Sequence, residues 1–159
     1  MNIEILTYLR DNPIKYPNDT EYRGEIKGIA LNEIEELEQL YNNGIAFPKG
    51  LRELLFLAGD YCYVLDTGWY DSQEEMQIAA REWLVKFSKN ISRPFFVIDV
   101  YNATDQFLYV YLDEGDNPYV YQAYLPERTD VEHFYSLNKK LSEYINGLIN
   151  TVKQGYNPF

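Results

Sequence analysis

Three apolar segments follow one another between residues 94 and 125, and only short polar connections separate them. The segments Pro94–Tyr101, Gln106–Leu112 and Tyr119–Leu125 are rich in aromatic and β-branched residues, which favour strands. The connections 102–105 and 113–117 consist mainly of Asn, Asp and Gly, and they are too short for a crossover helix. The sequence therefore predicts an antiparallel three-strand meander, and this meander limits the fold more than any other feature.

Alternation along the first two strands predicts two different sheet faces. One face carries aliphatic residues with one aromatic ring, and it is expected to belong to the core: Phe96, Ile98, Val100, Leu108, Val110 and Leu112. The other face is mostly aromatic and contains an acid: Phe95, Val97, Asp99, Tyr101, Phe107, Tyr109 and Tyr111. An open aromatic face could bind a partner, whereas a second layer of helices could equally cover it.

Helical patterns lie on both sides of the meander. A short helix is expected within Met1–Arg10. Four further helices are expected from Asn32 to the stop at Asn42-Asn43-Gly44, from Pro48 to Gly59, from Ser72 to about Phe87, and from just after Ser136 to Gly155. Trp83 lies in the apolar stripe of the third of these four, which predicts a core position. Tyr61–Asp66 is expected to be one more strand.

These elements predict an α+β fold, a mostly antiparallel sheet with a three-strand meander packed by about four helices. Residues 1–25 are rich in turn residues after the first helix and are interpreted as an extension packed on a domain formed by residues 26–159.

Charge is the second informative property of the chain, because 14 basic residues face 25 acidic ones and the net charge is −11. The regions 29–48, 60–75 and 99–127 contain four, five and six acids and no Lys or Arg. Binding to nucleic acid or to an anionic membrane is disfavoured, because both require basic surfaces. The acidic regions serve either solubility or attraction of a basic protein partner.

Residues for the common catalytic chemistries are scarce. The chain has one histidine, His133, and one cysteine, Cys62, and neither has partners at metal-ligand spacing. Cys62 is expected to be a buried apolar residue, and no phosphate-binding glycine loop is present. Carboxylates are plentiful, so a carboxylate-dependent hydrolase remains an alternative, although no pattern separates an acid from a base. No cofactor and no metal is expected, and with no leader or long apolar segment in view a cytoplasmic location is the default.

The segment Thr67-Gly68-Trp69-Tyr70-Asp71 offers the best candidate for a binding surface. Its large aromatic residues are placed by neither strand nor helix periodicity, and acids surround them, which is typical of an interaction hot spot. The alternative is that Trp69 folds back to close the end of the sheet. With the aromatic strand face included, the candidate partner-binding residues are Asp66, Trp69, Tyr70, Asp71, Glu74, Glu75, Asp99, Tyr101, Tyr109 and Tyr111.

Two short motifs resemble those of a known family. The run 29–40, with Ile34 and Leu37, precedes Phe47-Pro48 and a segment that ends at Ala58-Gly59. This pattern resembles the opening of the SUKH superfamily, also called the Smi/Knr family, with Phe47-Pro48 in place of Leu-Pro and Ala58-Gly59 in place of Asn-Gly. The meander and a closing helix such as Ser136–Ile149 also match, so that the resemblance spans about residues 26–153.

The resemblance implies a binding protein without catalytic residues. Bacterial members are similar to immunity proteins of polymorphic and contact-dependent toxin systems, which bind and block a cognate toxin, often a nuclease, and fungal members act as regulators or scaffolds of cell-wall synthesis and signalling. The leading hypothesis is a cytoplasmic immunity protein that binds a basic toxin domain and occludes its active face. A general interaction or scaffold module is the alternative.

Overall fold

A four-stranded antiparallel sheet forms the centre of the molecule in the computed structural model, which describes residues 1–67, 70–101, 105–127 and 132–158. The strands β1 (Phe95–Tyr101), β2 (Gln106–Tyr111), β3 (Tyr119–Tyr124) and β4 (Phe134–Lys140) are neighbours in chain order. Within these described ranges the helices are α1 (Thr7–Asp11), α2 (Leu31–Tyr41), α3 (Lys49–Ala58), α4 (Gln73–Lys86) and α5 (Leu141–Lys153). The fold is α+β, as predicted.

The predicted meander is present as β1, β2 and β3, and it gains a fourth strand that the sequence interpretation missed. Phe134–Lys140 pairs with β3, so the closing helix α5 begins at Leu141 and not just after Ser136. Aromatic and polar residues at 134–136 suit an edge strand, and Asn138 adopts a positive φ of 54° where the pairing with β3 is irregular. Leu137 fits the apolar periodicity of α5, and for this reason the sequence predicted a helix that begins too early in the chain.

A β-bulge in β1 exchanges the faces of its last residues. Val97 pairs with Tyr109, but the next pair is Asp99 with Leu108, which leaves Ile98 as an extra residue. Beyond the bulge, Val100 lies in the core cluster that contains Val97, whereas Tyr101 packs against the cluster that contains Ile98. The predicted faces are therefore correct up to Ile98 and wrong from Asp99 onward, because a single extra residue shifts a two-residue alternation.

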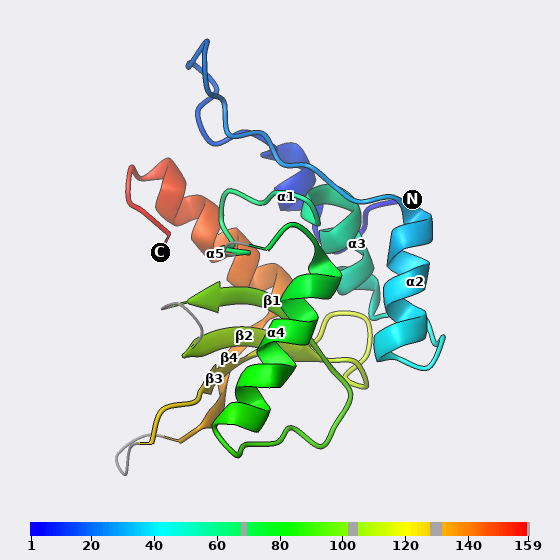
Figure 1. Ribbon diagram of the computed structural model, residues 1–159. Coiled ribbons are helices and arrows are strands. Elements are labelled where there is room, and N and C mark those ends of the chain that lie inside the picture. Colours follow the sequence, from blue (N-terminus) through cyan, green and yellow to red (C-terminus); the bar gives the residue numbers. More distant parts are fainter. Residues whose placement is uncertain (68–69, 102–104, 128–131, 159) are drawn as a thin grey trace.

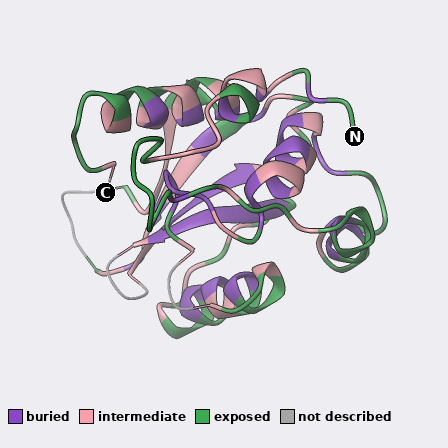
Figure 2. Cartoon of the chain, turned by 90° about the horizontal axis from the view of Figure 1, so that it is seen from above, coloured by how far each residue is buried: buried purple, intermediate pink, exposed green. Residues whose placement is uncertain are grey.

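Helices cover both faces of the sheet (Figure 1). On one face, α4 packs its buried residues, Trp83 among them, over the aromatic strand residues Phe107 and Tyr109. On the other face, α1, α3 and α5 build the larger core with Phe96 and Val110 of the sheet. Seen from above, the buried strands lie between an outer helix on each side (Figure 2). The aromatic face is thus covered, which decides between the two alternatives left open by the sequence.

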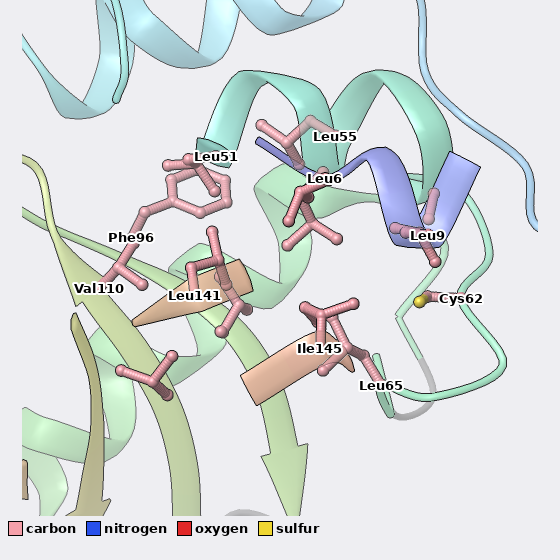
Figure 3. Packing of buried hydrophobic residues seen from close by; sticks show 14 of the residues in the cluster. Leu6, Leu9, Leu51, Leu55, Cys62, Leu65, Phe96, Val110, Leu141 and Ile145 are labelled. Carbon is pink, nitrogen blue, oxygen red and sulfur yellow. The ribbon is translucent and has the colours of Figure 1, made fainter. Parts of the chain in front are cut away.

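The N-terminal residues belong to the larger core. Leu6 and Leu9 are fully buried and lie beside Leu55 of α3 and Ile145 of α5 (Figure 3). The carboxylate of Glu53, itself 0 % exposed, accepts backbone N–H groups of Glu4, Ile5 and Leu6 at 2.7–2.8 Å. A buried carboxylate thus orients the start of α1 in place of a local helix cap. Residues 13–26 form a separate narrow loop that projects from the body.

The expected strand at Tyr61–Asp66 does not form. Tyr61 makes an isolated bridge with Lys27, and a turn follows, with the N–H of Leu65 facing the carbonyl of Cys62 at 3.4 Å. Beyond the bridge to Lys27, this segment forms no strand pairing with the described residues, because the chain turns directly after Tyr61. Cys62 is buried as predicted, and burial raises the pKa of its thiol to about 12.

Candidate functional site

A groove lies between one side of α2 and the segment that joins α3 to α4. Its volume is about 190 Å³. We call it the acidic groove, and it is lined by Ile29, Glu33, Glu36, Leu37, Leu40, Gly59, Asp60, Thr67, Tyr70, Asp71, Ser72, Gln73 and Glu74. Three of the predicted partner-binding residues, Tyr70, Asp71 and Glu74, line this groove together.

The first wall is one face of α2. Glu33, Glu36, Leu37 and Leu40 recur at helical spacing, so they stand above one another along the helix. Leu40 keeps 57 % of its surface exposed at this wall, so it offers apolar surface to the groove. At the start of the helix the N–H of Ala30 donates to Glu33 Oε2 at 2.9 Å, so the cap lies two residues before the predicted start at Asn32.

The second wall contains the start of α4. Ser72, the predicted start of this helix, caps it by accepting the N–H of Glu75 at 3.1 Å, and Glu75 accepts the N–H of Asp71 at 2.9 Å. Gln73 donates to the carbonyl of Gly59 at 2.7 Å and so joins α4 to the end of α3. These bonds fix the backbone on which Asp71 and Glu74 stand.

Arg81, on the side of α4, connects the two walls of the groove. The guanidinium of Arg81 lies 4.4 Å from the ring centroid of Tyr41, the last residue of α2, and 4.3 Å from that of Phe95 in β1. It also donates to the carbonyls of Gln77 and Phe95 at 3.0 Å. Burial lowers the pKa of Arg81, and stacking between two rings partly offsets the cost of holding a half-buried cation.

The groove carries five carboxylates and little compensating positive charge. Asp60 faces Lys27 at 4.0 Å, a distance at which two exposed side chains interact weakly. Within the described parts of the chain, no basic side chain lies within 4.0 Å of Glu33, Glu36, Asp71 or Glu74. Burial, followed by the charges of Glu75 and Glu82, raises the pKa of Tyr70, which therefore remains a neutral phenol. The result is a negative field around an apolar floor.

The carboxylates of the groove are spread along its walls. Among the residues that the structure describes, no three His, Cys, Asp or Glu side chains converge closely enough to hold a metal ion. The volume is also below the roughly 300–1,000 Å³ typical of small-molecule pockets. Size and charge distribution therefore favour an elongated organic cation, such as one side chain of a protein partner.

Asp99 and Tyr101, two further predicted site residues, lie elsewhere, in a buried polar cluster. Asp99 is 0 % exposed, and its carboxyl accepts the N–H of Asp66 at 2.8 Å and the hydroxyl of Tyr101 at 2.7 Å. The hydroxyl of Tyr144 lies 3.2 Å from that of Tyr101. Burial raises the pKa of Asp99 to about 8, against the lowering effect of its hydrogen bonds. The carboxyl is sealed from solvent, so in this structure it reaches neither a partner nor a substrate.

Tyr109 and Tyr111 lie in a third region of the molecule, beneath and beside α4. Tyr109 is 0 % exposed, and its ring stacks with that of Tyr121 at 5.5 Å. Tyr111 is half-buried, with the guanidinium of Arg93 at 3.8 Å from its ring centroid. Arg93 also pairs with Asp113 at 2.5 Å and with Glu114 at 3.1 Å. The aromatic face is therefore internally paired, and Tyr109 is not a surface residue.

The remaining predicted residues lie close to the groove or outside the description. Asp66 is exposed one residue before Thr67, and Glu75 contacts the groove wall through Asp71. Trp69 lies outside the described residues. The sequence interpretation missed the contribution of α2 to this surface, although the acidic regions 29–48 and 60–75 were both recognised separately.

Comparisons with known proteins give no match of this chain to a family model, a curated protein or a solved structure. Across the described residues, no helix combines the length and apolar character that crossing a membrane requires. The interpretation of the site therefore rests on the geometry given above.

Proposed function

We propose that this protein is a non-catalytic binding protein, an immunity protein that neutralises a basic toxin domain by covering its active face. The observation that carries the proposal is the acidic groove, in which two separate acidic regions of the chain meet around apolar residues. A nuclease must present positive charge to bind phosphate, and an acidic inhibitor is drawn toward that charge and competes with the substrate.

The order of elements supports the SUKH-type resemblance on which the proposal also depends. Ile34 and Leu37 of α2 face the core, Phe47-Pro48 directly precedes α3, and Ala58-Gly59 ends it. The meander follows, and α5 closes the described fold. These motif residues are buried and shape the fold, and two of them, Leu37 and Gly59, also line the groove.

Co-expression tests the proposal. The protein is produced in bacteria together with the C-terminal domain of a large toxin encoded next to its gene, and survival and co-purification are measured. We expect growth to be restored and a stable complex to form. Absence of both rescue and complex would contradict the immunity function, and a complex without rescue would favour a scaffold module instead.

A further inference from the structure

We infer that the acidic groove receives one arginine side chain of the partner, with the guanidinium group against Tyr70 and between the carboxylates of the two walls. This inference rests on the proposed function for the source of the arginine, and its chemistry can be tested without the toxin. Three properties of the described groove lead to it: its dimensions, its apolar floor and its unpaired acids.

The dimensions and the floor fit a long side chain with a charged end. A volume of about 190 Å³ admits one extended side chain and is too small for a folded segment. Ile29, Leu37 and Leu40 offer apolar surface to the methylene groups of such a side chain. Glu33 and Glu36 on one wall and Asp71 and Glu74 on the other supply negative charge to attract its charged end.

The same chain contains an occupied version of this arrangement. Arg93 stacks on Tyr111 at 3.8 Å and at the same time pairs with Asp113 and Glu114, which follow Tyr111 closely in sequence. In the groove, Tyr70 is followed by Asp71 and Glu74, and among described residues no cation occupies the corresponding position.

Arginine fits this arrangement better than lysine. Its planar guanidinium stacks on aromatic rings, presents donors to several carboxylates at once, and is less strongly hydrated than an ammonium group. Arg81, which lies 4.4 and 4.3 Å from two ring centroids, is also an arginine, whereas the lysines that lie over rings do so at 4.8–5.8 Å from a single centroid. The partner therefore presents an exposed arginine at the centre of its basic surface.

Titration of the ¹⁵N-labelled full chain with N-acetyl-arginine amide, followed by NMR, tests the inference. We expect saturable shifts of the amide signals of Leu37, Leu40, Gly59 and Gln73, with N-acetyl-lysine amide binding at least threefold more weakly. N-acetyl-citrulline amide, which has nearly the same shape but no charge, should bind at least tenfold more weakly. Equal binding of citrulline or lysine amide would overturn the inference, as would shifts spread over the whole acidic surface.

Two pairs of variants locate the binding. Glu36→Gln with Glu74→Gln removes one charge from each wall, and we expect the affinity for arginine amide to fall at least fivefold. The matched control, Glu35→Gln with Glu132→Gln, changes the net charge equally at two exposed residues that do not line the groove. Equal losses in both pairs would overturn the inference.

A third variant, Tyr70→Leu, tests stacking because it keeps an apolar side chain but removes the ring. We expect its affinity for arginine amide to fall about threefold and its affinity for lysine amide to stay nearly unchanged. Unchanged arginine binding would contradict the role of Tyr70. Binding of arginine amide without rescue from the toxin would refute only the proposed function. Rescue from the toxin without binding of arginine amide would refute only this inference.

Discussion

Replacing Asp99 by asparagine should change how the stability of this protein depends on pH. The folded protein raises the pKa of Asp99 from 3.8 to about 8, with burial as the main cause. Between these two values the folded state holds a proton that the unfolded state has lost. The contribution of Asp99 to stability is therefore fully present below about pH 4 and is lost as the pH rises toward about 8.

The magnitude follows from the same shift. One proton held by the folded state corresponds to a loss of about 1.4 kcal/mol in unfolding free energy per pH unit. Between pH 5 and pH 7 the wild type should lose about 2.5 kcal/mol through Asp99. The asparagine side chain of the Asp99→Asn variant has no such proton, and its amide oxygen can still accept the N–H of Asp66.

Urea denaturation at pH 5, 6 and 7 measures this difference directly. The groups that face Asp99 are the hydroxyls of Tyr101 and Tyr144 and the buried thiol of Cys62, whose pKa values are all raised. The charge of Asp66 also acts on Asp99, and it is present in both proteins that are compared. We expect the unfolding free energy of Asp99→Asn to fall less steeply with pH than that of the wild type, by about 1.4 kcal/mol per pH unit. Parallel curves for the two proteins would refute the assignment of a protonated, buried Asp99.

Two further substitutions test the core. Trp83 is 8 % exposed beside Phe107, so Trp83→Ala should destabilise the fold by about 3–5 kcal/mol in chemical denaturation, and a loss below about 1 kcal/mol would show that Trp83 is not a core residue. Glu53→Gln leaves one of the bonds to the N-terminal backbone without an acceptor, so we expect a loss of about 1–3 kcal/mol together with faster hydrogen exchange at residues 4–6. Unchanged exchange there would mean that the Glu53 carboxylate does not hold the N-terminus.

The fold class and the meander could be predicted because they depend on local signals. Alternating apolar residues and short polar connections between 94 and 125 leave one way for the strands to pair. The capping residue Ser72 and the core position of Trp83 were likewise visible in the sequence. Each of these features depends on residues that are close together along the chain.

The errors arose where tertiary contacts override a local pattern. Phe134–Lys140 forms a strand because β3 offers it an edge, and the extra residue at Ile98 follows from pairing with β2. Because the sequence does not reveal this extra residue, simple alternation assigned Asp99 to the aromatic face, although it lies buried on the other side. The acidic groove could be predicted only in part, because neighbouring acidic regions do not reveal which of their residues face one another.

The association of this protein with its toxin domain tests most directly whether the acidic groove recognises a basic partner. Binding kinetics would be measured at low and high salt for the wild type, for Glu36→Gln with Glu74→Gln, and for the control Glu35→Gln with Glu132→Gln. We predict that the groove pair raises Kd at least tenfold, that the control pair raises it less than threefold, and that salt slows association of the wild type. Equal effects of the two pairs would contradict binding through the groove.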